Sequence, residues 1–90
     1  MRKAAQLKIS GIVQGVFFRQ STQEKATELK IAGWVRNCED GAVELEAEGE
    51  EDALALFVQW CHRGPQRAVV RKVEIKNIEL QNHKRFEVRR

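Results

Sequence analysis

A glycine-containing segment that ends in an arginine is the first part of the chain whose residue types suggest chemistry. It reads SGIVQGVFFRQST, Ser10 to Thr22, with glycines at Gly11 and Gly15. Such a loop can turn its peptide N–H groups inward, and a helix that begins beside it adds unpaired N–H groups and the positive end of its dipole. Arg19 adds a planar guanidinium that matches two phosphate oxygens. The segment is therefore a candidate phosphate cradle.

The spacing of these residues leaves a structural interpretation open beside the functional one. Gly11 and Gly15 are also what a β-bulge and a turn require, and Arg19 could be an ordinary surface arginine. A nucleotide-hydrolysing P-loop is not expected, because that pattern needs Lys and then Ser or Thr after its last glycine. Here Val16 and Phe17 follow instead.

A second candidate for phosphate chemistry is CHRGPQR, Cys61 to Arg67, which has the Cys-x5-Arg spacing of cysteine-based phosphatases. Those enzymes need the cysteine at a helix N-terminus, whose dipole lowers the thiol pKa. We expect Cys61 on the last turn of a helix, facing the core, where both dipole and burial disfavour the thiolate. His62 and His83 have no partner that would activate a nucleophile, and we expect both to be exposed to solvent.

Composition sets the limits on class and location. The chain has 90 residues, 42% hydrophobic and 32% charged, with a net charge of +3, which predicts one ordered globular domain over residues 1–90. No apolar run is long enough to span a membrane, and no signal-peptide core follows the first residues. We expect a cytoplasmic monomer with two free thiols, Cys38 and Cys61. The cysteines and histidines lack the paired spacing of zinc sites, so no metal is expected.

The positions of apolar residues predict the elements that hold the glycine segment. Alternation predicts strands, and apolar residues three and four apart predict helices. The expected order is a strand at 7–13, a helix with an apolar stripe at 18–29, strands at 34–37 and 43–47 around an Asp-Gly turn, a helix at 50–63 and a strand at 68–75. A last short strand is expected at Phe86 and Val88. This order is an α+β, ferredoxin-like split β-α-β sandwich (βαββαβ), with a four-stranded antiparallel sheet and two helices on one face.

That topology places the glycine segment in space. The first strand and the strand at 34–37 should run the same way, with the strand at 43–47 antiparallel between them. Asn37 and the loop then end at the same edge of the sheet, on the order of 10 Å apart. Three glutamates, Glu44, Glu46 and Glu48, alternate with the apolar residues of the middle strand and should face water.

Two segments of the chain resemble the signature sequences of the acylphosphatases, small enzymes that hydrolyse carboxyl-phosphate anhydrides. They are ISGIVQGVFFR, Ile9 to Arg19, and GWVRNCEDGAVELEAEG, Gly33 to Gly49. The resemblance implies the same split β-α-β sandwich over the whole chain. Outside the two segments the match is one of pattern only, and the C-terminal NHKRFEVRR is where divergence is expected.

The resemblance also implies roles for particular residues. In the family the loop N–H groups and the arginine bind the phosphoryl group, while the asparagine holds the attacking water. These roles fall here on Arg19 and Asn37 as catalytic residues and on a phosphate-binding loop of Gln14, Gly15, Val16, Phe17, Phe18 and Arg19. An acyl phosphate would be the substrate and inorganic phosphate the product, with no metal or cofactor. An acyl phosphate already has a good leaving group, so positioning and charge neutralisation can supply most of the acceleration.

Two other functions use the same architecture. RNA-recognition modules stack bases on aromatic residues of the open sheet face, but here that face should carry the glutamates of the middle strand, so no nucleic-acid partner is expected. A domain that only senses acyl phosphates is the other alternative. The presence of both Arg19 and Asn37 disfavours it, and a turnover assay would decide.

Overall fold

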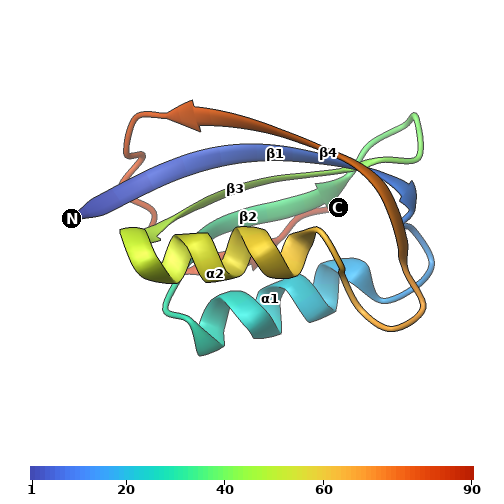
Figure 1. Ribbon diagram of the computed structural model, residues 1–90, viewed down its shortest axis with the longest axis horizontal. Helices are drawn as coiled ribbons and strands as arrows, with labels where there is room; N and C mark the ends of the chain where they lie inside the picture. The colour runs from blue at the N-terminus through green and yellow to red at the C-terminus, as the bar shows by residue number, and fades with distance from the viewer.

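The computed structural model describes residues 1–90 and contains five strands and two helices (Figure 1). The elements are β1 (Arg2–Ile12), α1 (Phe18–Glu28), β2 (Ala32–Asn37), β3 (Val43–Glu50), α2 (Glu51–Cys61), β4 (Val69–Ile78) and β5 (Phe86–Val88). The predicted α+β ferredoxin-like fold is confirmed.

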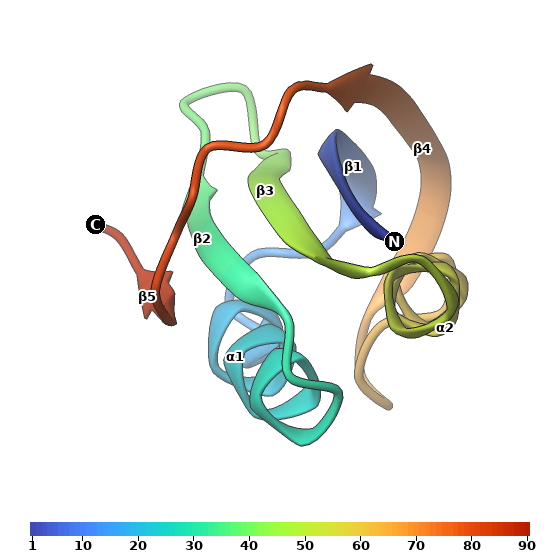
Figure 2. The same cartoon turned by 90° about the vertical axis from the view of Figure 1, so that its left-hand side faces the viewer.

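The sheet has the strand order β4-β1-β3-β2-β5. β3 pairs antiparallel with both β1 and β2, and β4 pairs antiparallel with β1, as the sequence predicted for a four-stranded sheet. The expected fifth strand is present at the edge, and it runs parallel to β2, which makes the complete sheet mixed. Both helices lie on the same face of the sheet (Figure 2).

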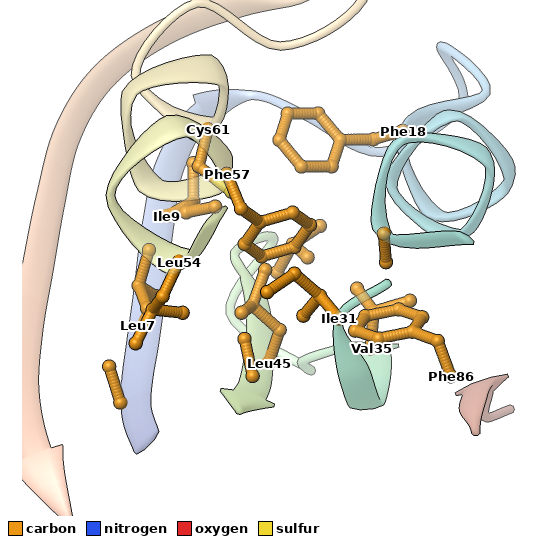
Figure 3. Packing of buried hydrophobic residues seen from close by; sticks show 14 of the residues in the cluster. Leu7, Ile9, Phe18, Ile31, Val35, Leu45, Leu54, Phe57, Cys61 and Phe86 are labelled. Carbon is orange, nitrogen blue, oxygen red and sulfur yellow. The ribbon is translucent and has the colours of Figure 1, made fainter. Parts of the chain in front are cut away.

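The core fills the space between the sheet and the two helices (Figure 3). The apolar residues that alternate along β1 and β3 point into it, and each helix adds one buried stripe. The stripe of α1 is Phe18, Thr22 and Ala26, and that of α2 is Leu54, Phe57 and Cys61. Burying each large apolar side chain contributes roughly 1.5–3 kcal/mol. Because Phe18 is both the first residue of α1 and a core residue, the start of this helix is fixed by packing.

The opposite face of the sheet carries a row of alternating charges. Glu74 lies opposite Lys8, Lys8 opposite Glu44, and Glu44 opposite Arg36, on four neighbouring strands. An ion pair of 2.6 Å joins Arg36 Nη2 to Glu44 Oε1, and this contact raises the pKa of Arg36. Opposite charges on neighbouring strands favour this register, since like charges placed there would repel.

Two residues differ from their predicted exposure. Glu48 was expected in water but is 1% exposed, because the segment after β4 folds over this end of the sheet. Its carboxylate accepts hydrogen bonds from the backbone N–H groups of Gln81 at 3.0 Å and Asn82 at 3.1 Å. His83 was also expected to be exposed, but it is half-buried with Nε2 3.3 Å from Glu46 Oε1.

Replacing Glu48 should destabilise the fold more than replacing a glutamate on the exposed part of the same strand face. Glu48→Ala leaves two N–H groups in a part-buried position without a protein partner, which we expect to lower the free energy of unfolding by about 1–3 kcal/mol. Glu44→Ala is the matched control and should cost less, because the ion pair of Glu44 is with an exposed arginine. Urea denaturation measures both, and equal losses would contradict the anchoring role of Glu48.

Candidate active site

The two glycines of the Ser10–Thr22 segment serve different purposes. Gly11 sits at a bulge where the register between β1 and β4 shifts, and a Cβ there would lie 2.1 Å from the carbonyl oxygen of Val69. Gly15 has φ of 74° and lies in the loop between β1 and α1, where a Cβ would have no neighbour within 4 Å. The bulge interpretation therefore holds for Gly11. Gly15 supplies the left-handed backbone that curves the loop.

The backbone N–H groups of this loop are free of protein acceptors. Along the chain, the first backbone N–H group of α1 that makes a helical hydrogen bond is that of Ser21, which donates to the carbonyl of Phe17 at 3.0 Å. Those from Gly15 to Gln20 donate to no backbone carbonyl. A helix start normally leaves such donors open, and here the loop extends the set. Together they can receive an anion.

Gln14 fixes the loop against the turn between β2 and β3. Its side-chain Nε2 donates to the carbonyls of Cys38 at 2.8 Å and Ala42 at 2.9 Å. The turn is tied to the sheet as well, since Lys8 Nζ lies 2.8 Å from Asp40 Oδ2, a contact that lowers the pKa of Asp40. The loop is therefore held in position by side-chain contacts, and its own backbone N–H groups stay free.

A pocket of about 500 Å³ opens where this loop meets the end of the sheet. In Figure 1 this is the end at which β1 stops, α1 begins and β2 stops. Arg19 and Asn37 both line it. The complete set is Val13, Gly15, Phe17, Phe18, Arg19, Gln20, Gln23, Asn37, Val88 and Arg90. It contains two arginines and no carboxylate side chain, so the pocket suits an anion and offers no acidic general base.

Of the six loop residues singled out in the sequence, the structure brings Gly15, Phe17, Phe18 and Arg19 to the pocket. The other two do not line it: Gln14 is engaged with the turn, and Val16 packs against the core. Asn37 reaches the pocket from the last position of β2, where it pairs with Val43, and it is half-buried.

Arg19 is held by the end of the C-terminal strand segment, a contact that the sequence did not predict. Its Nη1 donates to the carbonyl oxygen of Arg89 at 2.9 Å, directly after β5. Gln23, one turn further along α1, donates to the carbonyl of Phe86 at 3.2 Å. The bond to Arg89 uses one N–H group of the Arg19 guanidinium, and the other N–H groups are left for a ligand. Every residue type has a backbone carbonyl, so the sequence does not show which carbonyl Arg19 binds. The pairing of β5 with β2 in the structure identifies the acceptor as that of Arg89.

The cysteine of the Cys-x5-Arg segment does not lie at this pocket. Cys61 is the last residue of α2, is fully buried and does not line the pocket. Burial raises the pKa of its thiol far above the usual range. Cys38 and Cys61 are both free thiols, as predicted. His62 is exposed.

The structure contains neither a cluster of metal ligands nor a membrane-spanning helix. Nowhere in the structure do three or more His, Cys, Asp or Glu side chains gather as a metal site would need. Neither helix has the length and apolar character required to cross a membrane.

Comparisons with known proteins agree on one family. The family model described as acylphosphatase matches residues 5–88. A relative from Rubrobacter xylanophilus, named acylphosphatase, is 49% identical over 97% of this chain and 80% of its own length. One from Marinobacter nauticus with the same name is 57% identical over 74% of this chain and 73% of its own.

Solved structures lead to the same result. A structure titled as an acylphosphatase from Coxiella burnetii matches with a TM-score of 0.94 at 41% identity, covering 98% of this chain and 93% of that one. The crystal structure of acylphosphatase from Bacillus subtilis matches with a TM-score of 0.94 at 37% identity over the full length of both chains. The family model, the relatives and the shared fold thus converge, and the chain belongs to the acylphosphatase family of acylphosphate phosphohydrolases.

Proposed function

We propose that this pocket hydrolyses acyl phosphates without a metal, with Arg19 and the loop amides holding the phosphoryl group and Asn37 holding the attacking water. The observation that carries the proposal is the pocket itself, whose lining includes Arg19, Asn37 and residues of the loop with open donors but no carboxylate side chain. An anion site whose lining lacks metal-ligating carboxylate side chains is suited to a substrate whose leaving group is already good.

The phosphoryl group is bound by charge and by directed donors. Arg19 presents a fork that fits two phosphate oxygens, and the bond to the carbonyl of Arg89 orients that fork before substrate arrives. The N–H groups from Gly15 to Gln20 donate to no backbone carbonyl, so they are available to bind the same ligand at the positive end of α1. These donors also stabilise the charge that builds up on the phosphoryl oxygens during transfer.

The hydrolysis step needs one water and no covalent intermediate. The amide of Asn37 is neutral at any working pH, so it can hold a water by hydrogen bonds but cannot act as its base. The water oxygen bonds to phosphorus while the phosphorus–oxygen bond to the acyl group breaks. The electron pair of that bond leaves on the carboxylate, and a phosphate oxygen takes the proton of the water. Placement of the water is then the main contribution of Asn37.

The alternatives have weaker support. On the open face of β3, Glu44 and Glu46 stand where an RNA-binding module would need bases to stack, and their charge repels phosphate. A non-catalytic phosphate sensor would not need Asn37 in the pocket. A cytoplasmic location and a monomeric state stay predictions.

Substrate preference tests the proposed reaction. The protein should hydrolyse benzoyl phosphate and barely hydrolyse p-nitrophenyl phosphate, because the pocket offers placement but no nucleophile for the poorer leaving group. Activity should persist in EDTA, and inorganic phosphate should inhibit competitively. Efficient cleavage of the monoester, or dependence on an added divalent ion, would overturn the assignment.

Substitutions separate the roles of the two central residues. Arg19→Ala should weaken phosphate binding and lower turnover together, since each charge-assisted bond is worth roughly 1.5–3 kcal/mol. Arg19→Lys should recover only part of this because it keeps the charge and loses the fork. Asn37→Ala should bind phosphate nearly as well as the unaltered protein while kcat falls by about 10² or more, the cost of misplacing a reacting group.

Exposed residues of the same types on β4 serve as matched controls. Arg71→Ala and Asn77→Ala should leave both phosphate affinity and kcat unchanged, since neither residue lines the pocket. Titration calorimetry with phosphate and the turnover rate are measured for all five variants. Normal turnover in Asn37→Ala, or normal phosphate binding in Arg19→Ala, would show that the roles are assigned to the wrong residues.

The Cys-x5-Arg match is tested by removing its sulfur. Cys61→Ser should keep nearly full turnover, because the thiol is buried and does not line the pocket. Some loss of stability is expected from placing a hydroxyl in the core. Thermal unfolding and the rate with benzoyl phosphate are the two readouts, and a folded but inactive Cys61→Ser would restore the cysteine mechanism.

A further inference from the structure

Three structural features of Phe17 are unfavourable for stability, and none of them explains why an aromatic residue stands at this position. It adopts φ of 62° and ψ of 26°, the left-handed region that aromatic residues rarely occupy. It is the N-cap of α1, a position favoured by Ser, Thr, Asp or Asn, and it makes no side-chain capping bond. Its side chain is 68% exposed.

The ring of Phe17 also takes no part in the core. The other three phenylalanines form ring contacts with each other or with Trp60, at centroid distances of 5.9 to 6.5 Å. Phe17 is in none of these pairs, nor is it among the half-buried residues packed against the core. Neighbouring Gly15 shows that the loop carries glycine at its other left-handed position. Packing therefore does not account for an aromatic side chain at position 17.

The location of Phe17 suggests a reason for its aromatic side chain. It lines the pocket that also holds Arg19 and Asn37. The phosphoryl donors occupy the loop backbone and the guanidinium, so an apolar side chain in the same lining is left for the rest of the substrate. Strained residues persist mainly at sites that bind or react. An exposed ring beside the phosphate position can pack on an apolar group that enters with the substrate.

We propose that Phe17 determines specificity for the acyl group, and that its ring favours acyl phosphates with an aromatic or bulky apolar acyl part over acetyl phosphate. The inference rests on the proposed function, because it concerns the acyl side of the same pocket. Among the residues that line the pocket, Phe17 is the most exposed of the large apolar side chains.

The test is the ratio of kcat/KM for benzoyl phosphate to kcat/KM for acetyl phosphate, measured in variants of Phe17. Phe17→Asn suits both the left-handed backbone and the N-cap and removes the ring. The ratio should fall by roughly tenfold, the scale of losing one apolar contact surface in a specificity pocket. Any disturbance of the loop amides affects both substrates and cancels in the ratio. Phe17→Trp retains an aromatic ring and should stay within about twofold of the unaltered protein.

Stability and a distant control complete the experiment. Phe17→Asn should unfold at the same or a higher temperature, whereas a structural role for the ring predicts a lower one. Leu56→Ala removes an apolar side chain that is 55% exposed on α2, outside the pocket, and should leave the ratio unchanged. A Phe17→Asn ratio within twofold of the unaltered protein would overturn the proposal while leaving acyl phosphate hydrolysis intact. Failure of the unaltered protein to hydrolyse either substrate would overturn the proposed function instead.

Discussion

The antiparallel pairing of β3 with both of its neighbours is the constraint on which the site depends. Because β1 and β2 both run opposite to β3, they run in the same direction and end at the same edge of the sheet. The loop that leads into α1, whose second residue is Arg19, follows β1, and Asn37 ends β2. A shift of one residue would turn Glu44 and Glu46 into the core, so the alternation along β3 fixes the register. Fixing the register also fixes the end of the sheet at which Arg19 and Asn37 line the pocket.

The loop can remain open to a ligand because other contacts hold it in place. Gln14 bonds to the β2–β3 turn through its side chain, and Phe18 anchors the start of α1 in the core. The backbone donors between these two anchors are therefore not needed for folding. The strained conformation of Phe17 is tolerated for the same reason, since fixed chain on both sides determines the path between. Folding energy from the core thus maintains the conformation of the proposed anion site.

The segment after β4 connects the open face of the sheet to the pocket. Glu48 anchors its first part, the ring of Phe86 packs on Phe57 at a centroid distance of 5.9 Å, and the carbonyl of Arg89 receives the bond from Arg19. β5 has only three residues, so its place depends on these contacts as well as on pairing. Arg89 further stacks over Trp34, with Cζ 4.7 Å from the ring centroid. Orientation of Arg19 is in this way coupled to a chain segment far from it in sequence.

Three features could be predicted from the sequence alone: the order of the elements, the strand pairing around β3, and the placement of Arg19 and Asn37 at one edge of the sheet. These follow from local periodicity and from rules of chain connection, which need no knowledge of distant contacts. Three others could be found only in the folded structure: the burial of Glu48, the bond from Arg19 to the carbonyl of Arg89, and the exposed ring of Phe17. A carboxylate is buried when a distant segment happens to supply N–H donors, and a carbonyl acceptor carries no side-chain signature. The burial of Glu48 and the bond of Arg19 arise from long-range contacts between a side chain and backbone groups, which nearly every residue type offers alike.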